Sequence, residues 1–157
     1  MDMPDIDPRG QRFAAALTSL VLAVALLLES GWLVAVQAAV FAIGAVAGPH
    51  RGPYALLFRA LIRPRIGPPA ELEPAAPPRF AQGVGLGFAL LGAAGYLAGW
   101  ALLGTVATGF ALGAAFLNAT VGLCLGCEVY LLGRRALATV LSYRKLTNSP
   151  LLPKELR

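Results

Sequence analysis

The sequence predicts an all-α membrane protein, in which four transmembrane helices form two tandem hairpin repeats, each followed by a short amphipathic interfacial helix. Three observations support this prediction. The chain has 157 residues, of which 57% are hydrophobic and 13% are charged, whereas soluble domains are about 25% charged. The apolar residues lie in long blocks, which a chain of this length cannot bury in a soluble core. The same order of features also occurs twice along the chain.

Residues 1–12 form a short polar leader, in which Asp7 to Gly10 is predicted as a turn. The first hairpin repeat, with its interfacial helix, occupies residues 13–63. Its first apolar block, residues 13–28, would span about 24 Å as a helix, slightly short of a hydrocarbon core of roughly 30 Å. A cleaved signal peptide is the competing interpretation, but the leader is acidic and a second apolar block, residues 32–48, follows at once.

The second block ends at a break from Gly48 to Pro53, because two prolines and two glycines interrupt a helix there. Residues 54–63 then predict an amphipathic helix at the membrane surface, with Arg59 and Arg63 four residues apart. The six prolines of residues 64–78 predict a cytoplasmic linker without regular structure.

Residues 79–142 form the second hairpin repeat, which contains the only two cysteines of the chain. Its apolar blocks extend from Phe80 to near Gly122, with a turn that includes Gly99 and Trp100. Residues 131–142 again predict a short amphipathic helix. The remainder, residues 143–157, is predicted as a polar cytoplasmic tail.

Matching residues indicate two copies of one unit. The pairs are Arg12-Phe13-Ala14 with Arg79-Phe80-Ala81, Gly31-Trp32 with Gly99-Trp100, and residues 54–61 with residues 130–137. Because each copy has two spans, both copies share one orientation, unlike inverted transporter repeats. Chance similarity in a chain rich in Leu and Ala is the alternative.

The basic residues predict the orientation. All thirteen Lys and Arg lie in the leader, between the hairpins or in the C-terminal segment, and the two hairpin turns contain none. By the positive-inside rule, both termini and the linker are cytoplasmic. The basic residues form no stripe with interleaved aromatics, which argues against nucleic-acid binding. The expected location is a bacterial cytoplasmic membrane, with the lipid bilayer as the main partner.

The candidate site is the Cys-x-x-Cys pair of Cys124 and Cys127, which ends an uncharged run of 48 residues and precedes Glu128. The repeat places this pair in the turn between the fourth span and the helix after it, with Cys127 near that helix's N-terminus. The helix dipole favours a thiolate there, and Glu128 opposes it by like-charge repulsion. Two sulfurs at this spacing can bridge across a turn and support reversible disulfide chemistry.

Two other interpretations of the cysteines remain open. The pair could be half of a four-ligand metal site, which would need His50 and Glu128 as well, or a second chain in a homodimer. Alternatively, both cysteines are small apolar packing residues. A lone His50 in a Gly/Pro turn is more typical of a solvated side chain than of a catalytic one. No cofactor is predicted.

Polar groups within the spans are few. Asn118 and Gln37 are expected to hydrogen-bond to a neighbouring helix, and for Asn118 this role competes with positioning of the thiols. The apolar blocks contain no Asp, Glu, Lys, Arg or His, which argues against a proton relay or an ion path. Several glycines inside apolar spans predict close helix packing rather than a nucleotide-binding loop: Gly83, Gly85, Gly87, Gly109 and Gly113.

Residues 79–82 (Arg-Phe-Ala-Gln), 117–119 (Leu-Asn-Ala) and 122–130 together resemble a bacterial membrane family catalogued as domain of unknown function 4395. The resemblance covers roughly residues 5–140, and its most specific part is the Cys-Leu-Gly-Cys-Glu block. It implies a small integral membrane protein. In actinobacteria, members of that family tend to accompany thioredoxin-like proteins and sulfurtransferases.

The leading functional hypothesis is a membrane thiol–disulfide or sulfur-handling partner, in which Cys124 and Cys127 form a reversible disulfide or carry a persulfide. Glu128, Asn118 and His50 would shape the site. The resemblance implies that a soluble thioredoxin-like protein or a sulfurtransferase exchanges with it from the cytosol. The alternative is a non-catalytic scaffold or small permease with incidental cysteines.

Overall fold

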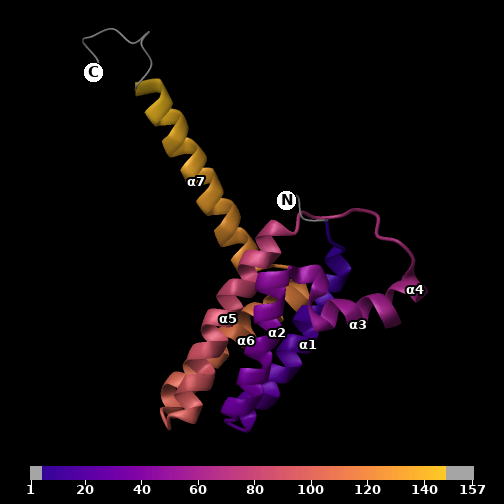
Figure 1. Cartoon of the computed structure of the whole chain (residues 1–157), viewed down its shortest axis with the longest axis vertical. Helices are drawn as coiled ribbons and strands as arrows, with labels where there is room; N and C mark the ends of the chain where they lie inside the picture. The colour runs from indigo at the N-terminus through magenta and orange to yellow at the C-terminus, as the bar shows by residue number, and fades with distance from the viewer. Residues whose placement is uncertain (1–4, 148–157) are drawn as a thin grey trace.

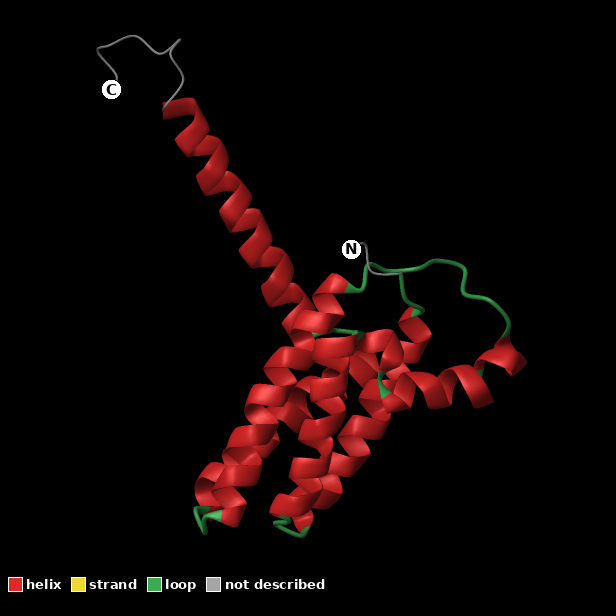
Figure 2. Ribbon diagram, viewed as in Figure 1, coloured by secondary structure: helices red, strands yellow, loops and turns green. Residues whose placement is uncertain are grey.

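The computed structural model describes residues 5–147, which are helical almost throughout (Figures 1 and 2). They form seven α-helices and one 3₁₀ turn, which confirms the prediction of an all-α protein. Four helices lie side by side as a bundle: α1 (Pro8–Leu27), α2 (Gly31–Ala47), α5 (Ala76–Leu97) and α6 (Ala101–Val121).

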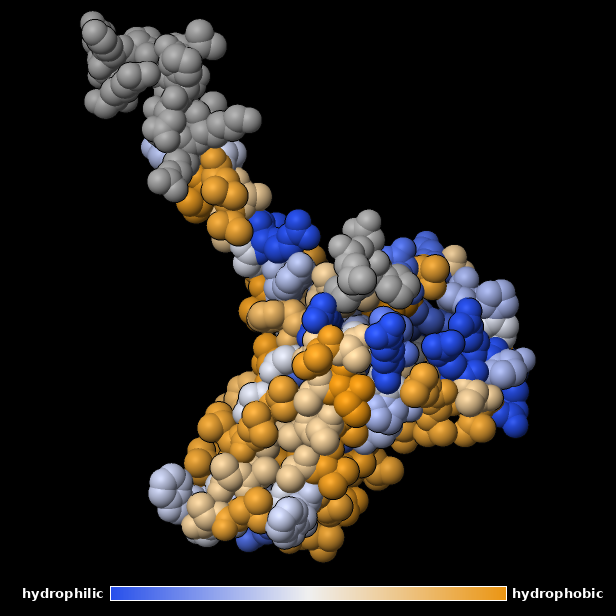
Figure 3. Space-filling view, viewed as in Figure 1, coloured by the Kyte–Doolittle hydropathy of each residue, from blue (hydrophilic) through white to orange (hydrophobic). Residues whose placement is uncertain are grey.

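The surface of this bundle is suited to lipid. The helices α1, α5 and α6 are long and apolar enough to cross a membrane, and α2 is a shorter apolar helix of 17 residues. Many large apolar side chains point outward, and Leu20, Val36 and Leu102 are 63%, 62% and 78% exposed. Figure 3 shows hydrophobic residues over most of the bundle and the largest group of hydrophilic ones at the end where the linker and α3 lie. Apolar surface of this extent indicates contact with a membrane.

The first helix begins earlier than predicted, so the turn predicted from Asp7 to Gly10 is wrong. Asp7 is instead the N-cap of α1: its Oδ1 accepts a hydrogen bond from the backbone N–H of Arg9 at 3.0 Å. The Arg9 side chain also donates to both carboxylate oxygens, which lowers the pKa of Asp7. Asp followed by Pro favours a helix start as well as a turn, because Pro fits the first helical position.

The chain between the hairpins is more regular than predicted. It contains the 3₁₀ turn η1 (Pro49–Arg51) and the helices α3 (Pro53–Leu61) and α4 (Arg63–Ile66). Pro77 and Pro78 belong to the first turn of α5, where the missing proline N–H breaks no helical hydrogen bond. Ile6 and Glu73 exchange two backbone hydrogen bonds of 2.8 and 2.9 Å, which hold the linker against the segment before α1.

The last helix differs most from its prediction. In place of a short helix over residues 131–142, α7 (Leu125–Thr147) is 23 residues long. This segment contains no proline, and its two glycines both keep helical backbone, so nothing stops the helix. It begins at the bundle and projects away from it (Figure 1), with residues 131–143 exposed. Residues 148–157 of the predicted tail and 1–4 of the leader lie outside the described residues.

Both hairpins point the same way, with their turns at one end of the bundle and the linker, α3 and the start of α7 at the other (Figure 2). Across the hairpins, α2 packs against α5 and α1 packs against α6. The first helix of each hairpin also contacts the helix that follows that hairpin. The rings of Phe13 and Phe58 lie 5.8 Å apart, and those of Phe80 and Tyr130 lie 5.7 Å apart.

Two arginines that match in the repeat each bond to the opposite hairpin. Arg12 on α1 donates from Nη2 to the carbonyl oxygen of Thr120, near the end of α6, at 2.9 Å. Arg79 on α5 donates to the carbonyl oxygens of Ala45 and Val46, near the end of α2, at 2.6 and 3.2 Å. The last carbonyls of a helix have no partner within the helix, so each hairpin caps the other.

Candidate functional site

The cysteine pair lies where the fourth bundle helix ends. Gly122 takes a left-handed backbone conformation, with a φ of 75°, and its N–H donates to the carbonyl oxygen of Asn118 at 3.1 Å. This glycine cap terminates α6 at Val121. Cys124 then precedes α7, and Cys127 lies in the first turn of α7. The pair therefore occupies the turn in which the repeat predicts it.

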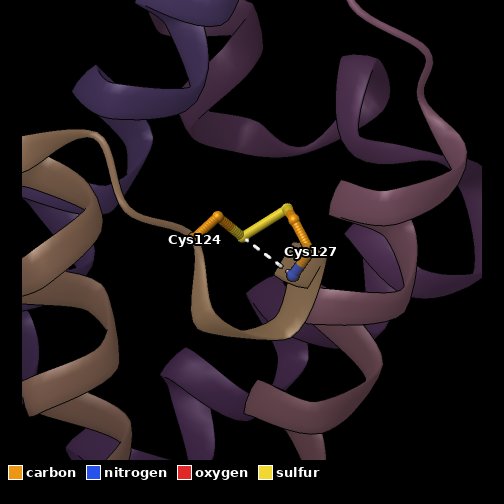
Figure 4. Close-up of a disulfide and its surroundings, with 2 residues drawn as sticks. All are labelled: Cys124 and Cys127. Carbon is orange, nitrogen blue, oxygen red and sulfur yellow. Dashed lines mark hydrogen bonds between the residues drawn. A yellow bond between two sulfur atoms is a disulfide. The ribbon is translucent and has the colours of Figure 1, made fainter. Parts of the chain in front are cut away.

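Cys124 and Cys127 are joined as a disulfide, with their Cα atoms 5.2 Å apart (Figure 4). The backbone N–H of Cys127 donates to the Sγ of Cys124 at 3.4 Å, and the N–H of Glu128 donates to the carbonyl oxygen of Cys124 at 3.0 Å. Cys124 is therefore the N-cap of α7, and Cys127 is the third residue of that helix. Both cysteines are half-buried.

The N-cap position determines which of the two sulfurs the N-terminal end of α7 stabilises most as a thiolate. The sequence favours Cys127 for this role, whereas in the structure the sulfur that accepts the helix N–H belongs to Cys124. Once the pair is reduced, the N–H groups and dipole of the first turn favour a thiolate at Cys124. Glu128 is exposed in the same turn, where its charge suits the helix dipole and opposes a nearby thiolate.

Gly126, between the two cysteines, brings the pair close to the bundle. A Cβ at this position would lie 2.6 Å from the Cβ and 2.7 Å from the Cα of Ala81 on α5. No side chain fits such a close approach, which is why glycine suits the position. The Phe80–Tyr130 ring contact joins the same two helices, so the cysteine turn is held firmly against α5.

A cavity of about 340 Å³ lies inside the bundle next to the pair. Of the two cysteines, Cys124 lines this cavity and Cys127 does not. Small and aromatic apolar side chains form most of the wall. The polar residues on the wall are Gln11, Thr18, Tyr54, Gln82 and Asn118. Asn118 therefore lies on the same cavity as Cys124, which keeps it a candidate for the site.

Gln37 forms the helix-to-helix bonds that the sequence predicts for it. It is fully buried on α2 and donates to Thr18 Oγ1 on α1 at 3.4 Å. Its Oε1 accepts a hydrogen bond from the hydroxyl of Tyr54 on α3 at 2.8 Å. Burial raises the pKa of Tyr54, so its hydroxyl stays protonated and remains a donor at neutral pH. This network joins the first hairpin to α3, and two of its members, Thr18 and Tyr54, line the same cavity.

His50 lines a different cavity from the one that Cys124 lines. Its ring packs over Gly48, and it lines a second cavity of about 280 Å³ together with Asp7 and Arg59. Within residues 5–147, no three His, Cys, Asp or Glu side chains come together as a metal site. His50 and Glu128 therefore do not complete a metal site with the cysteines in one chain.

The glycines of α5 and α6 divide into two groups. A Cβ at Gly85 would lie 2.9 Å from the Phe41 ring on α2, as close packing predicts, and a Cβ at Gly95 would lie 2.5 Å from the backbone nitrogen of Gly104. The prediction of close helix packing is wrong within this chain for four other glycines. A Cβ added at any of them would meet no atom within 4 Å in the described part of the chain: Gly83, Gly87, Gly109 and Gly113.

Sequence reasoning missed two amide residues of the central cavity. Gln11 lies on α1 with its Nε2 buried and without a hydrogen-bond partner among residues 5–147. Gln82 lies on α5, and a Cβ at Gly44 of α2 would be 2.7 Å from its Oε1. The available signal was a Gln close to the Arg-Phe pair near the start of the first helix of each hairpin.

An apolar bundle, three helices long enough to cross a membrane and a close cysteine pair define a multi-pass helical membrane protein. The chain belongs to the family described as Domain of unknown function (DUF4395), whose model matches residues 6–135 and confirms the resemblance seen in the sequence. The match includes the four bundle helices and both cysteines. No curated protein and no solved structure matches the chain.

Proposed function

We propose that this protein is a membrane thiol–disulfide or sulfur-handling partner whose reactive groups are Cys124 and Cys127. The observation that supports this proposal best is the geometry of the pair. The two sulfurs lie within bonding reach at a helix N-cap, half-buried, and one helix N–H points at Cys124. A packing role requires none of these features, whereas reversible disulfide exchange benefits from each.

The proposal includes a topology. The helices α1, α2, α5 and α6 are the four spans in a bacterial cytoplasmic membrane, arranged as two hairpin repeats of one orientation, with both termini in the cytoplasm. The distribution of Lys and Arg supports this, because the hairpin turns lack them and share one end of the bundle. The shortest span, α2, would extend about 25 Å, which is less than the roughly 30 Å thickness of the hydrocarbon core. A slight local thinning of the bilayer accommodates this difference.

Alkaline phosphatase fused after Gly31 or Gly99 should therefore be active in cells, because both turns face the periplasm. Green fluorescent protein fused after Gly67 in the linker should be fluorescent, because that segment stays in the cytoplasm. Reciprocal fusions at each position serve as controls. A cytoplasmic signal from either hairpin turn would contradict the topology and remove the cysteines from the cytoplasmic face.

The exchange step follows from the geometry. A thiolate of a soluble dithiol protein attacks the Sγ of Cys127, the S–S bond breaks, and Cys124 leaves as a thiolate that the first turn of α7 stabilises. The second thiol of the partner then attacks the mixed disulfide. The partner becomes a disulfide and the pair becomes two thiols, so two electrons and two protons pass to the pair. The reverse sequence would reduce an oxidised partner.

Cys124→Ser is expected to trap a soluble thioredoxin-like protein or sulfurtransferase as a mixed disulfide on Cys127. When Cys127 attacks the disulfide of an oxidised partner, release of that partner normally requires Cys124 to attack the Sγ of Cys127. Without Cys124 this release is blocked, so the mixed disulfide should accumulate above its level in wild-type membranes. Non-reducing electrophoresis followed by mass spectrometry would identify the species. Cys127→Ser should trap less, because Cys124 faces the internal cavity.

The double variant, Cys124→Ser with Cys127→Ser, is the matched control and should trap nothing. In inverted vesicles, a bulky maleimide should label the reduced wild-type protein and fail to label it after mild oxidation. If both thiols remain unreactive in right-side-out and inverted vesicles alike, they are packing residues, and a scaffold or small permease becomes the better interpretation.

A further inference from the structure

The cavity beside Cys124 has the size and lining of a small-molecule site. Its volume of about 340 Å³ falls in the range of ligand pockets, roughly 300–1,000 Å³. Residues from both hairpins, α3 and the start of α7 surround it, so an occupant would lie within the bundle. Among the residues that line it there is no Asp, Glu, Lys, Arg or His. The wall therefore suits an uncharged, largely apolar molecule.

The cavity also reaches the lipid-facing surface. Val84 on α5 and Phe110 on α6 both line it, and these residues are 38% and 64% exposed. The rings of Phe88 and Phe110 lie 5.9 Å apart on this side of the bundle. The wall of the cavity on the side of α5 and α6 is therefore shared with the surface that faces the bilayer.

The cavity wall also carries amide side chains, which can donate hydrogen bonds to oxygen atoms of a bound molecule. Gln11, Gln82 and Asn118 line the cavity together with Cys124. The Nε2 of Gln11 is a buried donor with no partner in the described part of the chain, although buried donors are normally satisfied. A carbonyl oxygen on a bound molecule would accept this missing hydrogen bond after a small rotation of the amide.

We propose that this cavity binds the ring of a lipophilic quinone, which exchanges electrons with the cysteine pair through Cys124. This inference rests on the proposed thiol–disulfide function and names its second reactant. A quinone ring is flat and apolar, and its two carbonyl oxygens match amide donors. Its isoprenoid tail would remain in the bilayer. A phospholipid fits poorly, because the lining offers no charged residue to its headgroup.

The electron transfer balances as a two-electron exchange. The Cys124 thiolate adds to a ring carbon of the quinone, and the thiolate of Cys127 then attacks the Sγ of Cys124. The new S–S bond forms while the S–C bond breaks, and its electron pair passes to the ring. The two protons released by the thiols end on the two ring oxygens. The pair is oxidised to the disulfide, and the quinone is reduced to the quinol.

Photolabelling with an azido derivative of a short-chain quinone tests binding without requiring turnover. The full-length protein in lipid nanodiscs should be labelled on residues 81–88 or 110–118, and excess decylubiquinone should compete. The double cysteine variant should still show labelling that decylubiquinone competes, because the amide side chains of the wall remain, but it should reduce no quinone. Labelling spread over the outer surface without competition would overturn the proposal.

Variants of the wall sharpen this test. Ala115→Trp fills the cavity and should abolish the competed labelling, whereas Val106→Trp, on the exposed side of the same helix, should leave it unchanged. Asn118→Leu is a milder change, expected to raise the half-saturating decylubiquinone concentration about tenfold through loss of one hydrogen bond. If neither Ala115→Trp nor Asn118→Leu changes the labelling, the cavity is not the quinone site.

A measurement of quinone reduction distinguishes failure of the quinone site from failure of the proposed thiol–disulfide function. Reduced wild-type protein under anaerobic conditions should convert one equivalent of decylubiquinone to its quinol, followed by ultraviolet absorbance. If soluble partners are trapped on Cys127 but the quinone is neither bound nor reduced, the thiol function stands and the quinone site is rejected. If competed labelling occurs but no partner is trapped and no quinone is reduced, the thiol function is rejected and the cavity is only a binding site.

Discussion

Replacement of Gly126 by Ala is expected to destabilise the folded protein by about 1–3 kcal/mol, the usual cost of overpacking a tight contact. The new Cβ would lie 2.6 Å from the Cβ and 2.7 Å from the Cα of Ala81. Neither atom belongs to a flexible side chain, so the start of α7 would have to move away from α5. This movement would also displace the cysteine turn, so Gly126→Ala should weaken partner trapping together with stability.

Gly133→Ala is the matched control on the same helix, because a Cβ at Gly133 would meet no atom within 4 Å in the described structure. There the change should stabilise the helix by roughly 0.5–1 kcal/mol, since Gly is a poor helix former. Thermal unfolding in detergent should therefore show a lower Tm for Gly126→Ala and an equal or higher Tm for Gly133→Ala. Equal responses of the two variants would show that α7 does not pack on α5 at Gly126.

Gln37→Ala is expected to destabilise the protein by about 2–4 kcal/mol, because it leaves a cavity in the bundle and removes two hydrogen bonds. The side chain is fully buried and links Thr18 on α1 with Tyr54 on α3. The Tyr54 hydroxyl would lose its acceptor, and α3 would lose a polar bond to the bundle.

Val36→Ala is the control for this change, since Val36 precedes Gln37 and is 62% exposed. Its effect should stay within about 0.5 kcal/mol, as for most surface substitutions. Tyr54→Phe should show part of the Gln37→Ala loss without any cavity. Unfolding in a graded denaturing detergent would measure all three variants, and a loss for Val36→Ala as large as that for Gln37→Ala would contradict the buried network.

The sequence predicted most reliably what local chemistry determines. The hairpin turns and the end of α6 follow from glycines and from the edges of apolar blocks, and the structure places Gly122 as a helix cap. The position of the cysteines followed from the repeat. The start of α1 was misjudged because Asp followed by Pro favours both a turn and a helix start.

Features that depend on packing could not be predicted from the sequence. The sequence predicts too short a last helix, because it assigns the cysteines to a turn and the polar residues after 142 to a tail, whereas α7 begins at Leu125 and continues to Thr147. The central cavity joins Gln11, Gln82 and Asn118, which lie on three helices, and only the arrangement of both hairpins brings them together. The N-cap role of Cys124 has a sequence signal, since N-cap and third helical residue have the spacing of Cys-x-x-Cys.

The exchange of arginine caps between the hairpins bears on how such a protein could originate. Arg12 caps α6 and Arg79 caps α2, which is the reciprocal contact that a two-fold homodimer makes. An ancestral chain with one hairpin could have formed the same bundle by pairing with a parallel copy of itself. Gene duplication and fusion would preserve those contacts while releasing each copy to specialise. In the present chain, the Gln37–Tyr54 network joins α2 to α3, and the cysteines lie at the start of α7.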